Sequence, residues 1–271
     1  MASNCLERFS TSMYAAGPGG VFAARKCPEL ETQASAMTNQ QPYTGFSTSG
    51  GFDGASFPDN PDPRAPCILV MDVSGSMGGR PIAALNAGLH EYRDAVIQDP
   101  IAARRVEIAI VSFGGTVDMV QHFVEVSNFV PPQLVVSGDT PMATAVTRAI
   151  LELEARKQSY RDAGIQFYRP WIFLFTDGGP TEGDEKWRVA CEAVRRGEAE
   201  KKFTFYAVGV EGADFSKLAE ISPNRSPLKL NGIAFGEFFR WLSASQKTVS
   251  QSQPGQAIVL PPPTGWGTAV V

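Results

Sequence analysis

Cysteine, histidine and clustered basic residues are scarce in this sequence, and their scarcity excludes several kinds of protein. Among 271 residues there are four cysteines and two histidines, and no two cysteines form a Cys-x-x-Cys pair. Disulfide frameworks and zinc sites need such residues in clusters, so we expect reduced cysteines and neither of these features. The chain has 24 Lys and Arg against 28 Asp and Glu. Without a basic stripe, it is not expected to bind nucleic acid.

Long apolar runs are missing as well. No stretch reaches the roughly 18 consecutive apolar residues of a transmembrane helix, so we expect no membrane interaction. The N-terminal residues do not resemble a secretory signal, because Glu7 and Arg8 interrupt them early and Gly-Pro-Gly-Gly follows at 17–20. These features predict a cytoplasmic protein.

The composition changes twice along the chain. Residues 1–65 are rich in Ser, Thr, Gly, Asn, Gln and Pro and have no helical or strand period. This pattern is typical of a flexible extension, although its scattered aromatic residues leave docking on the domain or on a partner open. We expect one domain over residues 66–248 and a tail over residues 249–271. The tail contains three consecutive prolines and Trp266. Three alternatives are open for it: a disordered segment, a polyproline ligand, or a segment that packs back on the domain.

Apolar strands and amphipathic helices alternate between residues 66 and 248. The runs at 67–72 and 171–177 are apolar almost to their final Asp, as expected for strands buried on both faces. Further strands are predicted over 106–115, 117–126, 203–210 and 228–230, and helices over 81–99, 140–160, 185–201, 214–222 and 234–250. The order predicts an α/β fold. It is a Rossmann-like, doubly wound, mostly parallel sheet with one antiparallel edge strand and helices on both faces.

Three oxygen-bearing side chains follow the first buried strand. Asp72, Ser74 and Ser76 stand two residues apart in the segment Asp-Val-Ser-Gly-Ser. If the loop curls, which Gly75 and Gly78 permit, all three side chains point to one place. Carboxylate and hydroxyl oxygens are hard ligands, which suit Mg²⁺, Mn²⁺ or Ca²⁺ better than zinc.

Two further oxygen ligands are expected at the same edge of the sheet. Thr140 opens a predicted helix after a long loop, and Asp177 ends the second apolar strand. Open parallel sheets bind ligands beyond the carboxyl ends of their strands, where the strand order reverses. We therefore predict a metal site formed by Asp72, Ser74, Ser76, Thr140 and Asp177. The structural alternative is that these side chains only form turns and cap helices.

The five residues, taken in this order, resemble the metal-ion-dependent adhesion site (MIDAS) of von Willebrand factor type A domains. That pattern consists of D-x-S-x-S, a Thr in a later loop and an Asp in a T-D-G turn, and the resemblance covers residues 66–248. Several segments are similar to the bacterial cytosolic subgroup typified by the tellurium-resistance protein TerY, among them F-F-x-W-L-S-x-S at 238–245. The family resemblance implies a non-enzymatic module that binds a protein partner through a divalent cation, with an acidic residue of the partner on the metal. The subgroup implies a role in a bacterial stress-response complex.

Three acidic residues near the predicted site lie outside the five-residue pattern. Asp139 stands where the subgroup usually has a second Gly before the Thr, and it either strengthens cation attraction, holds a metal-bound water or faces solvent. Glu182 and Asp184 follow Asp177, close to the expected mouth of the site. We expect both to be solvated loop charges, and the alternative is that they tune the electrostatic potential of the site.

Two alternative functions stay open at this point. A Mg²⁺-dependent phosphatase-like hydrolase needs an acid/base Asp two residues after its nucleophilic Asp, and Ser74 takes that position. The second alternative is a scaffold whose metal site is vacant. The sequence predicts no oligomeric state and does not identify the partner.

Overall fold

A seven-stranded sheet forms the centre of the computed structural model, which describes residues 60–262 and 266–269, all within the unit Asp53–Val271. The strands follow the order β3-β2-β1-β4-β5-β6-β7. Their bounds are β1 (Ala65–Asp72), β2 (Val106–Gly114), β3 (Thr116–Glu125), β4 (Trp171–Thr176), β5 (Thr204–Gly209), β6 (Leu228–Leu230) and β7 (Gly267–Ala269). The extension predicted over residues 1–65 lies almost wholly outside the described residues.

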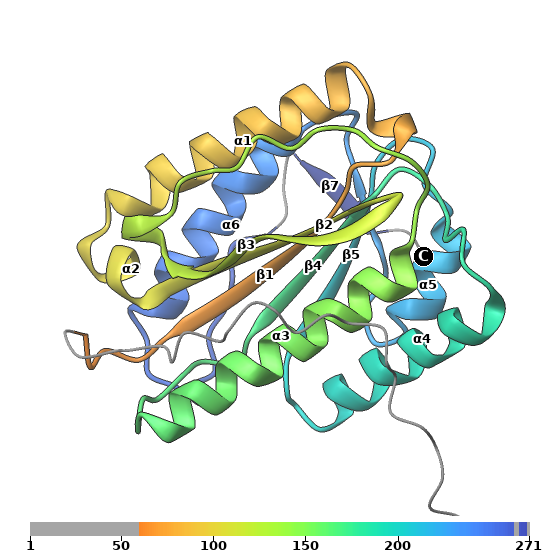
Figure 1. The fold of residues 1–271 in the computed structure, drawn as a ribbon. Coiled ribbons are helices and arrows are strands. Elements are labelled where there is room, and N and C mark those ends of the chain that lie inside the picture. Colours follow the sequence, from red (N-terminus) through yellow and green to blue (C-terminus); the bar gives the residue numbers. More distant parts are fainter. Residues whose placement is uncertain (1–59, 263–265, 270–271) are drawn as a thin grey trace, which may run out of the picture. The chain divides into compact units, whose positions relative to one another are not determined.

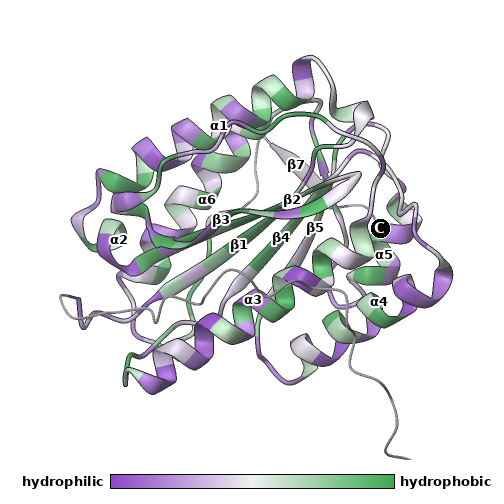
Figure 2. Ribbon diagram, viewed as in Figure 1, coloured by the Kyte–Doolittle hydropathy of each residue, from purple (hydrophilic) through white to green (hydrophobic). Residues whose placement is uncertain are grey.

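Strand directions confirm the predicted α/β fold. β1, β2, β4, β5 and β6 run parallel, whereas β3 pairs antiparallel with β2 at one edge. Every residue of β1 is buried, while β3 alternates between exposed and half-buried positions, as expected for an edge strand. In Figure 2, the central strands are coloured mainly as hydrophobic, whereas the helices carry both hydrophobic and hydrophilic colours.

Helices cover both faces of the sheet (Figure 1). They are α1 (Arg80–Ile97), α2 (Pro100–Arg105), α3 (Met142–Asp162), α4 (Asp184–Ala199), α5 (Phe215–Ile221) and α6 (Phe235–Ser250), with short 3-10 turns η1 (Gly75–Met77) and η2 (Val126–Asn128). The helices α1, α2 and α6 pack on one face, and α3, α4 and α5 on the other. All but α2 were predicted, within two residues at either end. In the described residues, no helix combines the length and hydropathy needed to cross a bilayer.

The C-terminal segment returns to the domain. Trp266 is fully buried, and its ring centroid lies 5.0 Å from that of Phe238 and 5.2 Å from that of Trp241. The next three residues form β7, which pairs antiparallel with β6. Residues 266–269 therefore adopt the packed-back arrangement, one of the three alternatives for the tail. Burial of one large aromatic side chain explains it, because Trp266 directly precedes the strand that follows.

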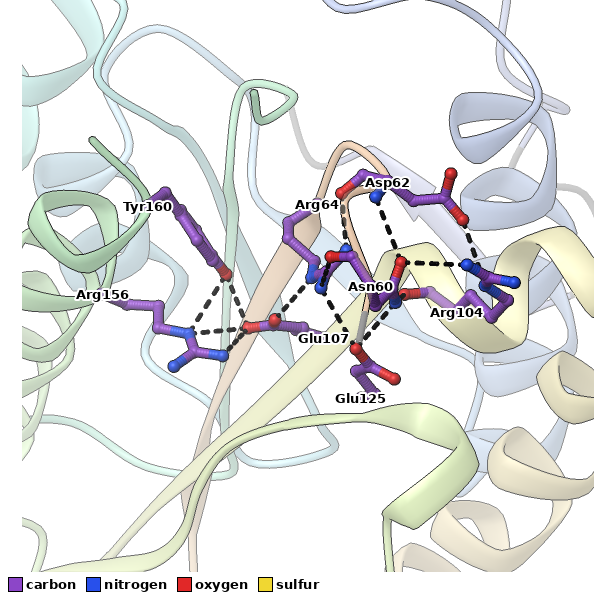
Figure 3. Close-up of polar contacts among 8 residues, drawn as sticks. All are labelled: Asn60, Asp62, Arg64, Arg104, Glu107, Glu125, Arg156 and Tyr160. Carbon is purple, nitrogen blue, oxygen red and sulfur yellow. Dashed lines mark hydrogen bonds and ion pairs between the residues drawn. The ribbon is translucent and has the colours of Figure 1, made fainter. Parts of the chain in front are cut away.

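Buried charges hold the chain where it enters β1 (Figure 3). Arg64 and Glu107 have fully buried side chains, with 3.1 Å between Nε and Oε1. The other oxygen of Glu107 accepts hydrogen bonds from Arg156 at 2.7 Å and from the Tyr160 hydroxyl at 2.6 Å. Arg64 also lies 3.2 Å from a carboxylate oxygen of Glu125. This network sits at the amino end of β1, the end of the strand away from the predicted metal site.

Candidate metal centre

The predicted site residues lie beyond the carboxyl ends of β1 and β4. These neighbouring strands are the ones between which the strand order reverses, since the chain builds β2 and β3 on one side of β1 and β5 and β6 on the other side of β4. Such a reversal leaves room for a ligand, because the two following loops turn to opposite faces of the sheet. Asp72 is the last residue of β1, and Asp177 comes directly after β4.

Asp72 is held from both loops. Its side chain is fully buried, Oδ1 accepts a 2.8 Å hydrogen bond from the Ser74 amide, and Oδ2 accepts one of 2.5 Å from the Thr176 hydroxyl. The Gly178 amide donates to that same hydroxyl at 3.1 Å, which fixes its direction. The carboxylate of Asp72 therefore has a single orientation set by its neighbours.

The serine loop and the Asp177 loop meet directly. The Ser74 and Ser76 hydroxyl oxygens lie 3.2 Å apart, and the Ser76 hydroxyl donates a 2.7 Å hydrogen bond to Oδ1 of Asp177. These two loops are 101 residues apart in the sequence, yet their hydroxyl and carboxylate oxygens meet directly. Ser76 is exposed, so the cluster opens to solvent on the side of η1.

Thr140 is brought to the same place by the long loop that precedes α3. The amide of Gly75 donates to the Gly138 carbonyl at 3.1 Å, so the loop lies against the serine loop. Gly138 has a φ of 53°, and a Cβ there would lie 2.5 Å from the Cα of Gly115, so the approach requires glycine. The Thr140 hydroxyl also lies near the loop that carries Asp177, because a Cβ on Gly178, the residue after Asp177, would lie 4.0 Å from that hydroxyl oxygen. Within the described part of the chain, that hydroxyl donates to none of the other four predicted ligands.

Electrostatics and donor types fit a hard divalent cation. Burial raises the pKa of the Asp72 carboxyl above its ordinary value, and the negative charge of Asp177 adds to the rise, while hydrogen bonds from Ser74 and Thr176 oppose it. A cation between the two carboxylates would relieve both the burial and the repulsion. Among the described residues, no three His, Cys, Asp or Glu side chains cluster in a way that could hold a metal. The available donors are two carboxylates and three hydroxyls, a set that suits Mg²⁺, Mn²⁺ or Ca²⁺.

The capping alternative receives no support from the local geometry. Of the described elements, η1, α1 and α3 begin without a side-chain hydrogen bond at the N-cap. The hydroxyls of Ser74, Ser76 and Thr140 are therefore not used to cap the helices that follow them.

One acidic residue near the site differs from its prediction. Glu182, expected to be solvated, has a side chain that is only 9% exposed, and it accepts a 3.0 Å hydrogen bond from the amide of Thr144. It is buried because it lies against the start of α3, not in the mouth of the site. Asp184 is exposed as expected, and Asp139 is exposed to solvent.

Sequence reasoning missed the contacts of three residues near the site, namely Thr176, Thr181 and Glu182. Thr176 orients Asp72, Thr181 bonds to the backbone of Thr140, and Glu182 bonds to Thr144 on α3. Thr176 lies next to Asp177 in a T-D-G turn, and its position at the end of a fully buried strand was an available signal for a hydroxyl that needs a partner. Thr181 and Glu182 had no such signal, because their partners are on α3 and on the loop before it.

Comparison with known proteins places the fold in a family. The model of the von Willebrand factor type A domain matches residues 67–235. No curated protein sequence matches significantly. The pilus adhesin SpaC from Lactobacillus rhamnosus GG, in its open conformation, is similar with a TM-score of 0.56 and 14% identity, over 69% of this chain and 30% of that chain. Proximal thread matrix protein 1 from the mussel byssus, with a zinc-occupied MIDAS motif, is similar with a TM-score of 0.44 and 18% identity, over 68% of this chain and 48% of that chain.

Both solved structures are distant from this chain. At 14% identity, the likeness to SpaC shows the fold alone. The chain spans less than half the length of either structure.

Proposed function

Because the chain belongs to the von Willebrand factor type A domain family, we propose that it is a non-enzymatic module that binds a protein partner through a divalent cation. The ligands would be Asp72, Ser74, Ser76, Thr140 and Asp177, and the cation Mg²⁺, Mn²⁺ or Ca²⁺. The main support is the 2.7 Å hydrogen bond between Ser76 and Asp177, which joins two loops that a metal ion would have to bridge.

The donor set supports an acidic side chain as the partner's contribution. Two carboxylates leave a bound divalent cation with an open position and affinity for one more anionic oxygen. The protein groups are already oriented: Thr176 and the Ser74 amide hold Asp72, and Ser76 holds Asp177. A partner carboxylate would then meet a site whose geometry is fixed before it arrives.

Apolar residues beside the site also support a protein partner. Val135 and Val136 lie on the loop leading to Thr140, just before Ser137, and they are 70% and 37% exposed. The loop is tied down, since the amide of Ser137 donates to the Val73 carbonyl at 2.7 Å. Because burial of exposed apolar side chains is favourable, solvent-exposed valines on a fixed loop favour contact with another protein surface.

The finer assignment is a TerY-like role in a cytoplasmic bacterial stress-response complex. Its support is the similarity of sequence segments such as F-F-x-W-L-S-x-S. On α6, the Phe238 ring packs edge-on against Phe175 with centroids 4.8 Å apart. Part of that motif is therefore buried in the hydrophobic core. The hydrolase alternative lacks a similar observation, because Ser74 occupies the position of the acid/base residue.

Metal and partner binding test the proposal together. Metal-depleted protein should bind Mn²⁺ in a calorimetric titration, and Asp72→Ala should abolish the binding. A partner captured with Mn²⁺ present should be released by EDTA and should not bind Asp72→Ala, checked for folding by circular dichroism. Capture that resists both changes would contradict the proposal. Mg²⁺-dependent hydrolysis of an aryl phosphate that is lost in Asp72→Ala would instead favour the hydrolase.

A further inference from the structure

Helix α3, which follows Thr140, does not satisfy its own first turn. Its N-cap residue is Pro141, no side chain of the helix itself caps it, and no acidic residue lies in its first turn. The first backbone amides of a helix need acceptors, and its positive end favours a negative charge. A helix with a buried start must obtain these acceptors and this negative charge from another part of the chain.

Glu182 supplies what α3 lacks. One carboxylate oxygen accepts the 3.0 Å hydrogen bond from the Thr144 amide, and the other accepts a short hydrogen bond from the Thr144 hydroxyl. Both donors belong to one residue in the first turn of α3, so the carboxylate is held at two points. Lys186 is 3.6 Å away but is 67% exposed, so solvent weakens this ion pair.

Thr181, the preceding residue, forms a second link to the same segment. Its amide donates to the Thr140 carbonyl at 3.1 Å, and its hydroxyl accepts a 3.2 Å hydrogen bond from the Thr140 amide. Thr140 is thus bonded through both of its backbone polar groups to one residue. Thr181 and Glu182, which we call the α3 clamp, join the loop after Asp177 to the residues around Thr140.

We propose that Glu182 is a positioning residue for the metal centre, an inference that rests on the function proposed above. Glu182 does not bind the metal. Through the α3 clamp it holds Thr140 and Asp177 at the separation that a shared cation requires. Residues that orient metal ligands typically change metal affinity about 10- to 100-fold when they are replaced. The affinity for the cation therefore depends on a carboxylate outside the ligand set.

Three variants separate positioning from charge. Glu182→Gln keeps the shape but replaces an accepting oxygen by an amide nitrogen that cannot accept from Thr144. Thr144→Val removes only the hydroxyl donor and leaves every charge in place. Asp184→Asn is the matched control. It also removes one negative charge, but Asp184 lies two residues after Glu182 and its side chain is exposed. Each full-length protein is titrated with Mn²⁺ by calorimetry, and its thermal midpoint is measured in EDTA.

We expect Glu182→Gln to weaken Mn²⁺ binding about 10- to 100-fold, Thr144→Val to weaken it in the same direction, and Asp184→Asn to leave it unchanged. An unchanged Mn²⁺ affinity in Glu182→Gln overturns the inference, even if the thermal midpoint in EDTA falls. Equal weakening in Glu182→Gln and Asp184→Asn, with Thr144→Val unaffected, overturns it too, because charge alone would then explain the loss. If the unmodified protein binds no Mn²⁺, the proposed function itself fails, and this inference fails with it.

Discussion

Glu107 has no exposed side-chain surface and lies between two arginines, Arg64 and Arg156 (Figure 3). A buried carboxylate is tolerated only when its charge and its lone pairs are matched. Here each oxygen has a cationic partner, and Tyr160 donates a further hydrogen bond. Burial, and then the charge of Glu107, raise the pKa of Tyr160 well above its ordinary value, so its hydroxyl remains a donor.

Replacing Glu107 by Gln should be strongly destabilising. The change leaves the buried Arg64 without its main counter-charge, and breaking a buried pair from one side typically costs about 3–5 kcal/mol. Glu125→Gln is the control, since that side chain also contacts Arg64 but is 25% exposed. Urea denaturation of both variants measures the difference, and similar losses for the two would contradict the expected dependence on burial.

Two short elements, β7 and α2, show how tertiary contacts act at the scale of a strand or helix. β7 has three residues, and within the described part of the chain it pairs with one strand, the equally short β6. Such a strand has little stability alone, so its place depends on Trp266, which packs against the rings of Phe238 and Trp241. α2 has six residues and begins after Asp99, whose carboxylate accepts hydrogen bonds from the amides of its first turn. The position of β7 therefore depends on Trp266, and the start of α2 depends on Asp99.

Trp266→Ala should therefore lower the free energy of unfolding by about 3–5 kcal/mol, as for other large aromatic side chains removed from a core. Val259→Ala, a change in the same C-terminal segment at a residue that is 92% exposed, should have little effect. Thermal unfolding followed by circular dichroism provides the measurement. If the two variants unfold at the same temperature as the unmodified protein, Trp266 does not anchor the edge of the sheet.

At the scale of the whole molecule, the reversal of strand order between β1 and β4 decides where the candidate site lies. Three loops that leave the sheet far apart in sequence meet at that one point, whereas the buried charge network sits at the other end of β1. Metal binding should consequently stabilise the entire domain, because the ligands come from loops that separate when it unfolds.

Metal removal tests this coupling. Saturation with Mn²⁺ at 100 times its dissociation constant should stabilise the native state by about 2.7 kcal/mol, since the unfolded chain does not assemble the site. The shift in the thermal midpoint should disappear on addition of EDTA and should be absent in Asp177→Ala. A midpoint that does not respond to Mn²⁺ in the unmodified protein would support the scaffold with a vacant site.

Most of the fold could be predicted because the relevant patterns are local. The apolar runs of β1 and β4 and the helical periods of α1 and α6 are visible in short windows of sequence. The segment before residue 60 stays a prediction, as do the domain boundaries. α2 was missed because six residues are too few to show a period. β7 was missed because its pairing depends on the burial of a single tryptophan against helix α6.

The same division applies to the candidate site. The sequence by itself determined the identity and order of Asp72, Ser74, Ser76, Thr140 and Asp177, and their role as metal ligands stays a prediction. Only the tertiary structure decided that Thr176 orients Asp72 and that Glu182 holds the start of α3. The physical reason is that these hydrogen bonds join residues 104 and 38 positions apart, and such contacts leave no periodic pattern in either segment of the chain.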